Sequence, residues 1–143
     1  MRMIWAGAAA LAGLMVATGN GMAGSDPSGI WRMASGKVTV KLAPCGNAFC
    51  GTVVGLKRPL DKHGRPKRDK ENPNPSLRER PVIGLMIMAN MVPTGDNRWD
   101  GTIYNPDDGK SYRSNLKLQN TNLMKVEGCV SVFCKTMKFI RVK

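Results

Sequence analysis

Residues 99–118 place the strongest constraint on the fold. Two stretches rich in β-branched and aromatic residues flank the sequence Asn-Pro-Asp-Asp-Gly-Lys. Pro106 presets φ, the aspartate side chains can bond nearby backbone, and Gly109 accepts a positive φ, so the centre predicts a tight turn. The stretch after the turn alternates between an apolar and a polar face, and the apolar face holds Tyr112, Leu116 and Leu118. This pattern predicts an antiparallel β-hairpin with one half-buried face.

The rest of the chain contains further short β-patterns. Counting the hairpin, they lie at residues 29–32, 38–42, 50–56, 83–88, 98–104, 110–118, 122–130 and 133–142. The 16 glycines and 9 prolines also favour turns over long helices. About eight short strands joined mostly by short turns are typical of an all-β barrel or sandwich. With 143 residues, the chain has the length of one domain with a modest core.

One long segment, residues 57–80, breaks this pattern because it is rich in Lys, Arg and Pro. Loops of this length in small domains are usually functional or disordered. We favour a solvated connection, with one helical turn at residues 75–80, over a lid or a phosphate-binding surface. Its acidic residues could neutralise neighbouring cations, and they are Asp61, Asp69, Glu71 and Glu79.

The amino terminus predicts a secretory signal peptide over residues 1–23. Arg2 precedes an apolar run at residues 4–17, and small residues follow up to Ala23. The alternative is a membrane anchor, but the run is shorter than the roughly 20 residues that a spanning helix needs. We therefore expect an exported protein, periplasmic or secreted, whose residues 24–143 form one domain without a transmembrane segment. Loss of Arg2 lowers the formal charge from +12 to +11.

Four cysteines form two C-x4-C pairs. In an oxidising compartment an even number of cysteines suggests disulfides, and four cysteines allow three connectivities. The hairpin context favours the local pairs Cys45–Cys50 and Cys129–Cys134. A four-cysteine zinc site is the rival interpretation, but zinc modules usually have C-x2-C spacing.

Several motifs appear in a fixed order along the chain. They are Gly29-x-Trp31, Cys45 to Cys50-Gly51, Asp69-x-x-Asn72-Pro73, Arg80-Pro81-x-x-Gly84, Trp99-x-Gly101-x-Ile103-Tyr104-x-Pro106-x-x-Gly109-Lys110-x-Tyr112 and Arg141-Val142. Together they resemble the bacterial exported family called domain of unknown function 2147, over nearly the whole mature chain. The resemblance implies a lipocalin-like β-barrel and carries no established activity. Thr102 stands where this family usually has glycine and Phe139 where it usually has tryptophan, which affects local packing rather than the fold.

The resemblance also gives Gly29, Trp31 and Arg141 a structural role. Lipocalin-like barrels begin with Gly-x-Trp and close with an arginine of the last strand stacked on that tryptophan. Such a stack contributes roughly 0.5–2 kcal/mol, depending on burial. The alternative is that Arg141 is simply an exposed terminal residue.

No catalytic constellation is present in the sequence. It has neither a Gly-x-Ser-x-Gly motif nor a phosphate-loop pattern, and its single histidine, His63, lies in the basic segment. Asp107 and Asp108 fit turn bonding better than paired-carboxylate chemistry. The methionines at 86, 88 and 91 fit core packing better than a Cu(I) site. We therefore expect a protein that is not an enzyme, with no cofactor and no metal site.

The sequence leaves function open between a carrier and a surface-binding module. We favour binding of a small amphipathic or apolar ligand at the barrel mouth, and the candidate contacts are Asn72, Arg78, Arg80, Trp99, Tyr104 and Tyr112. The alternative is a basic module that binds anionic envelope polymers or lipids. An enzyme with an unrecognised site is a third hypothesis. Nucleic acid is not an expected partner of an exported chain. The volume inside the barrel would discriminate the first two, since a filled barrel has no room for a ligand.

Overall fold

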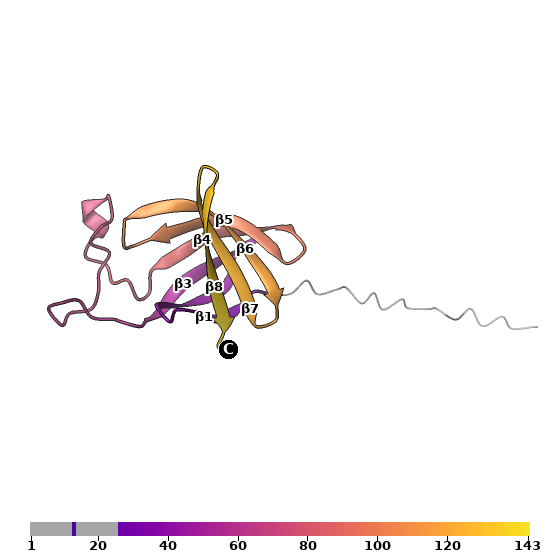
Figure 1. Cartoon of the computed structure of the whole chain (residues 1–143), viewed down its shortest axis with the longest axis horizontal. Helices are drawn as coiled ribbons and strands as arrows, with labels where there is room; N and C mark the ends of the chain where they lie inside the picture. The colour runs from indigo at the N-terminus through magenta and orange to yellow at the C-terminus, as the bar shows by residue number, and fades with distance from the viewer. Residues whose placement is uncertain (1–12, 14–25) are drawn as a thin grey trace, which may run out of the picture.

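A computed structural model describes residue 13 and residues 26–143 of the chain. Its strands form a closed barrel in which each strand pairs antiparallel with the next and the last pairs with the first. The strands are β1 (Gly29–Met33), β2 (Val38–Cys45), β3 (Ala48–Leu56), β4 (Met86–Gly95), β5 (Arg98–Asn105), β6 (Lys110–Asn120), β7 (Leu123–Val130) and β8 (Phe133–Arg141). Figure 1 shows this barrel with the long loop between β3 and β4 to its left. The predicted all-β barrel is confirmed. The predicted signal peptide lies outside the described residues, apart from residue 13.

One predicted strand begins in the wrong place. The apolar run over residues 83–88 predicts a strand there, but β4 begins only at Met86. Gly84 has a φ of +99°, and the Leu85 amide donates to the Val82 carbonyl at 3.0 Å. Residues 82–85 therefore form a turn that brings the chain out of the long loop, and Ile83 is exposed.

Side chains fill the inside of the barrel. The interior residues that are almost fully shielded from solvent are Trp31, Val40, Leu42, Val53, Met88, Met91, Leu116, Met124, Val126 and Phe139. An eight-stranded barrel is just wide enough for side chains of this kind or for one small ligand. The two departures from the family pattern fit this packing, since Phe139 lies in the core and Thr102 faces outward on β5.

The barrel closes through a short seam between β1 and β8. Three residue pairs make this seam, Trp31 with Arg141, Arg32 with Ile140 and Met33 with Phe139. The Arg141 guanidinium carbon lies 4.3 Å from the centre of the Trp31 ring, so the stacked pair is present at the seam. This contact joins the first strand to the last across a ladder of three residue pairs.

Backbone carbonyls hold the Arg141 guanidinium in place. It donates to the carbonyls of Ser28 at 2.5 Å, Thr121 at 2.7 Å and Asp26 at 3.1 Å. Gly29 has a φ of +138°, and a Cβ there would lie 2.5 Å from the Lys143 carbonyl oxygen and 2.6 Å from Arg141 Nη1. The backbone conformation and the close carbonyl therefore explain why glycine stands beside the guanidinium.

Both predicted local disulfides are confirmed. Cys45 bonds to Cys50 across the β2–β3 hairpin, with a Cα–Cα distance of 5.9 Å. Cys129 bonds to Cys134 across the β7–β8 hairpin, with a Cα–Cα distance of 4.1 Å. Because all four sulfurs are in disulfides, none is a thiolate that could bind zinc, and the rival zinc hypothesis is wrong.

Replacing Trp31 with alanine should strongly destabilise the barrel. The substitution removes a fully buried ring and the face on which Arg141 stacks. We expect a loss of about 3–5 kcal/mol in the free energy of unfolding, measured by denaturant titration. Leu60→Ala, at an exposed loop position, is the control and should cost less than about 0.5 kcal/mol. An unchanged unfolding midpoint for Trp31→Ala would contradict this packing.

Candidate functional site

The long loop between β3 and β4, residues 57–85, follows a defined path. Two isolated β-bridges fold it back on itself, Leu60 with Pro66 and Arg68 with Pro81. A single 3-10 turn, η1 (Pro75–Leu77), begins at Asn74, whose side chain accepts a hydrogen bond from the Ser76 amide. The predicted helical turn is therefore present but shorter than residues 75–80. The loop stands away from most of the barrel in Figure 1.

A buried carboxylate ties this loop to the barrel. Asp69, with a side-chain exposure of 0%, accepts a hydrogen bond from Tyr104 Oη of β5 at 2.5 Å. Asn72 Nδ2 donates to Asp69 at 2.9 Å, and Arg80 donates to the same oxygen through Nε and Nη2, both at 2.9 Å. Asn72 Nδ2 also lies 3.2 Å from Tyr104 Oη. We call these four residues the Asp69 cluster.

Hydrogen bonds within the Asp69 cluster keep the carboxylate charged. Burial pushes the pKa of Asp69 up, but the bonds from Tyr104, Asn72 and Arg80 and the positive charge of Arg80 outweigh burial and hold this pKa below its usual value. Burial and the neighbouring Asp69 carboxylate raise the pKa of Tyr104 to about 12. The tyrosine therefore remains a proton donor to the carboxylate across the neutral range.

The loop also lies directly on the β5–β6 turn. A Cβ on Gly109, whose φ is +70°, would lie 1.9 Å from the Glu71 carbonyl oxygen, so only glycine allows this approach. Arg78 Nε donates to the Asn72 carbonyl at 2.7 Å and braces the same stretch from outside. The motifs around Asp69, Arg80, Tyr104 and Gly109 are thus explained by one docking contact between loop and hairpin.

The six predicted ligand contacts do not form one site. Three of them, Asn72, Arg80 and Tyr104, hold the loop against the barrel through Asp69, and Arg78 bonds only within the loop, to the Asn72 carbonyl. Trp99 is buried in the core, edge-on to Phe49 with ring centres 6.1 Å apart, and its Nε1 has no partner among the described residues. Tyr112 donates to Asp108 in the β5–β6 turn. Whether any of them binds a ligand stays a prediction.

Asp69 was not predicted to be the centre of this arrangement. From the sequence it was one of several acidic residues that could neutralise neighbouring cations, and it also headed a family motif. Its position at the head of the Asp69-x-x-Asn72-Pro73 motif was the available signal, since a motif residue in a loop needs a specific contact.

Most cations of the docked loop remain available to a partner. Arg68 pairs with Glu79, and Arg80 pairs with Asp69. The carboxylate of Asp61 instead accepts hydrogen bonds from the backbone amides of His63 and Arg65. Within residues 26–143 no ion pair involves the other loop cations, which are Lys57, Arg58, Lys62, Arg65, Lys67, Lys70 and Arg78. We call these seven residues the basic loop set.

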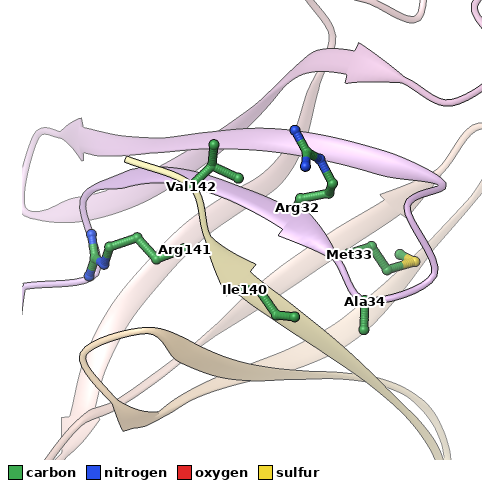
Figure 2. A pocket seen from close by; sticks show the side chains of 6 residues that line it. All are labelled: Arg32, Met33, Ala34, Ile140, Arg141 and Val142. Carbon is green, nitrogen blue, oxygen red and sulfur yellow. The ribbon is translucent and has the colours of Figure 1, made fainter.

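Two hollows open on the outer wall of the barrel. One, of about 290 Å³, lies between β1 and β8 and is lined by Arg32, Met33, Ala34, Ile140, Arg141 and Val142. Figure 2 shows the Arg141 side chain turned away from Arg32, so only Arg32 offers its charge there. The other hollow, of about 230 Å³, lies over β5, β6 and the Cys129–Cys134 disulfide. Neither hollow lies inside the barrel.

The fold and the loop define a small lipocalin-like barrel that carries a docked basic loop. Residues 29–141 match a family described as uncharacterised protein conserved in bacteria, DUF2147, and the chain belongs to this family. A solved structure, protein HP1028 from the human pathogen Helicobacter pylori, described as belonging to the lipocalin family, is similar over 82% of this chain and 84% of its own, with 25% identity and a TM-score of 0.69. No curated protein shows significant similarity to the chain.

In the part of the chain that the structure describes, no helix has the length and apolar character needed to span a membrane.

Replacing Asp69 with asparagine should release the loop from the barrel. The variant removes the negative charge opposite Arg80 and one acceptor of the Tyr104 hydroxyl. Hydrogen bonds to charged groups contribute about 1.5–3 kcal/mol each. We expect faster tryptic cleavage within residues 57–80 while the barrel stays folded. Glu79→Gln, which removes only an exposed ion pair, is the control and should cleave at the wild-type rate. Equal cleavage of all three proteins would contradict the docking role.

Loop docking should also depend on pH. The folded-state pKa of Asp69 lies below its unfolded value of about 3.9, so its contribution to stability is present above that value and is lost as pH falls further. The pKa of Tyr104 is raised to about 12, so its contribution is lost as pH rises above about 10. NMR signals of the loop amides should therefore shift together at the acidic and alkaline ends. Amide signals of Asp69, Asn72 and Arg80 that move in the neutral range instead would contradict this assignment.

Proposed function

We propose that this protein is a non-catalytic binding protein that uses the outside of its barrel to bind an anionic surface. The basic loop set would contact phosphate or carboxylate groups of an envelope polymer or of lipid headgroups. The observation that carries the proposal is the docked loop, which presents seven cations without ion pairs among the described residues. The formal charge of +12 for the chain also favours binding to an anionic surface.

Docking makes the loop a better binding surface than a free chain of the same composition. The Asp69 cluster and the contact at Gly109 fix part of the loop backbone before a partner arrives. Less conformational entropy is then lost on binding. Arginine suits planar, bidentate contacts with phosphate or carboxylate, and the set contains Arg58, Arg65 and Arg78.

The hypothesis of a small amphipathic ligand inside the barrel receives less support. Trp31, Phe139 and the neighbouring methionines occupy the interior. A fatty acid would instead have to use the outer hollow beside Arg32, which is about 290 Å³ in volume and open to solvent. Drug-sized ligand sites are usually about 300–1,000 Å³ and enclose most of the ligand.

The same geometry supports a binding role over catalysis. A lipocalin-like fold is associated with binding, and the buried Asp69 accepts hydrogen bonds from three side chains that favour its charged form. A general acid or base works best with a pKa near the operating pH. The pKa of Asp69 is instead lowered from its usual value, away from neutral pH. Asp107 and Asp108 are engaged in the β5–β6 turn and with Lys37.

We also propose that the protein acts outside the cytoplasm, in the periplasm or secreted. The amino-terminal sequence has the pattern of a signal peptide. Two disulfides are typical of an oxidising compartment. Anionic envelope components would then be within reach.

Charge substitutions in the loop test this proposal. The triple variant Lys62→Ser, Arg65→Ser, Lys70→Ser should bind vesicles rich in phosphatidylglycerol, and heparin, more weakly than the wild type. Each cation near an anionic surface contributes about 1 kcal/mol, so we expect a loss of about 100-fold at low salt. The matched control, Lys41→Ser, Lys117→Ser, Lys143→Ser, removes the same charge from other parts of the surface and should lose far less.

Salt separates this proposal from the carrier hypothesis. Attraction to an anionic surface should weaken as ionic strength rises, because the Debye length falls to about 8 Å at physiological salt. Equal losses in the two triple variants would contradict the role of the loop. Saturable binding of a fluorescent fatty acid that persists at high salt would favour the carrier.

A further inference from the structure

The β7–β8 hairpin extends beyond the strands on either side of it. The pairing of β6 with β7 ends at Arg113 and Cys129, and the pairing of β8 with β1 involves only Phe139 to Arg141. Among the described residues, the end of the hairpin beyond Cys129 therefore has strand partners only within the hairpin itself. Figure 1 shows this tip, in yellow and orange, projecting above the body of the barrel.

The tip of this hairpin is apolar and exposed. Val130, Val132 and Phe133 are 58%, 84% and 78% exposed. Side chains this open to water contribute nothing to the barrel core. Three of them within four residues form a small exposed hydrophobic patch. We call residues 130–133 the apolar tip.

Two features hold the apolar tip in a fixed shape. The Cys129–Cys134 disulfide closes the hairpin directly behind it. Arg113 Nη2 donates to the carbonyl of Ser131 at 2.7 Å, which places a guanidinium beside the apolar side chains. Lys135 follows the disulfide and is exposed. The apolar tip is thus a small hydrophobic patch with two cations, Arg113 and Lys135, at its base.

The apolar tip and the basic loop leave the barrel at the same end. In a barrel whose strands alternate in direction, the β3–β4, β5–β6 and β7–β8 connections all lie at one end. The long loop is the β3–β4 connection, and it lies on the β5–β6 turn. One end of the molecule therefore combines exposed cations with exposed apolar side chains.

We propose that the apolar tip inserts into the headgroup region of an anionic lipid bilayer while the basic loop set, Arg113 and Lys135 contact the headgroups. This inference rests on the proposed function and narrows its partner from any anionic surface to a lipid surface. Charge complementarity accounts for the cations, and the apolar layer of a bilayer would take up the exposed Val132 and Phe133 beside them. Peripheral membrane binding commonly combines buried apolar area with attraction to anionic lipids.

Substitutions in the tip test insertion directly. The double variant Val132→Ser, Phe133→Ser should bind phosphatidylglycerol-rich vesicles about tenfold more weakly or worse, because it removes the apolar contribution. Its binding to heparin, which has no apolar layer, should be unchanged. The matched control Ile140→Ser, Val142→Ser removes two exposed apolar side chains at the other end of β8 and should bind vesicles as the wild type does.

A second variant reports how deeply the apolar tip enters the bilayer, and its readout does not depend on a loss of binding. Phe133→Trp should show a blue-shifted emission with vesicles and quenching by brominated lipids, whereas the buried Trp31 and Trp99 should be quenched little. Absence of extra quenching would overturn the proposal, as would wild-type vesicle affinity of the double serine variant.

Other outcomes separate the two proposals. If the loop variant loses vesicle and heparin binding while the tip variant loses neither, the tip proposal fails and the proposed function stands. If the wild type binds neither probe, both proposals fail. If the tip variant changes only self-association in sedimentation, the tip is a contact between two copies of the chain, and the membrane proposal is overturned.

Discussion

The width of the barrel is the constraint on which the rest of this structure depends. Eight strands enclose a space that large side chains can fill, and Trp31, Phe139 and several methionines fill it here. The stack of Arg141 on Trp31 then fastens the last strand to the first across a short seam. In this lipocalin-like fold large side chains therefore occupy the interior, and the binding that we propose takes place on the outside.

The outside of the barrel carries two segments that packing alone does not explain. The long loop is held by a buried carboxylate, and its docking orients a set of cations that have no ion pairs among the described residues. The apolar tip of the β7–β8 hairpin exposes Val132 and Phe133, and a disulfide closes the hairpin at its base. Because both segments lie at one end of the barrel, charge and apolar surface can act on the same partner.

The sequence predicted the parts of this structure that depend on local patterns. Alternating strands, the Asn-Pro-Asp-Asp-Gly-Lys turn and the short cysteine spacings gave the all-β fold and both disulfides. The family resemblance supplied the Trp31–Arg141 stack. The predicted start of β4 was wrong because Gly84 turns the backbone within residues 83–88, an apolar run that fits a strand equally well.

Contacts between distant residues could not be predicted in the same way. Asp69 and Tyr104 lie 35 positions apart, and nothing local shows that the loop returns to β5. Residues 130 and 133 end two predicted strands and residues 131–132 are the turn between them, but how far this turn projects depends on where β6 and β1 end.

Hydrogen–deuterium exchange, compared between the free protein and the protein on anionic vesicles, tests the central claim most directly. Binding on the outside predicts slower exchange in the long loop and in residues 130–133, with little change in the strands that surround the core. Slower exchange confined to β1, β4 and β8, whose side chains fill the interior, would instead show that the partner enters the barrel and would contradict this account.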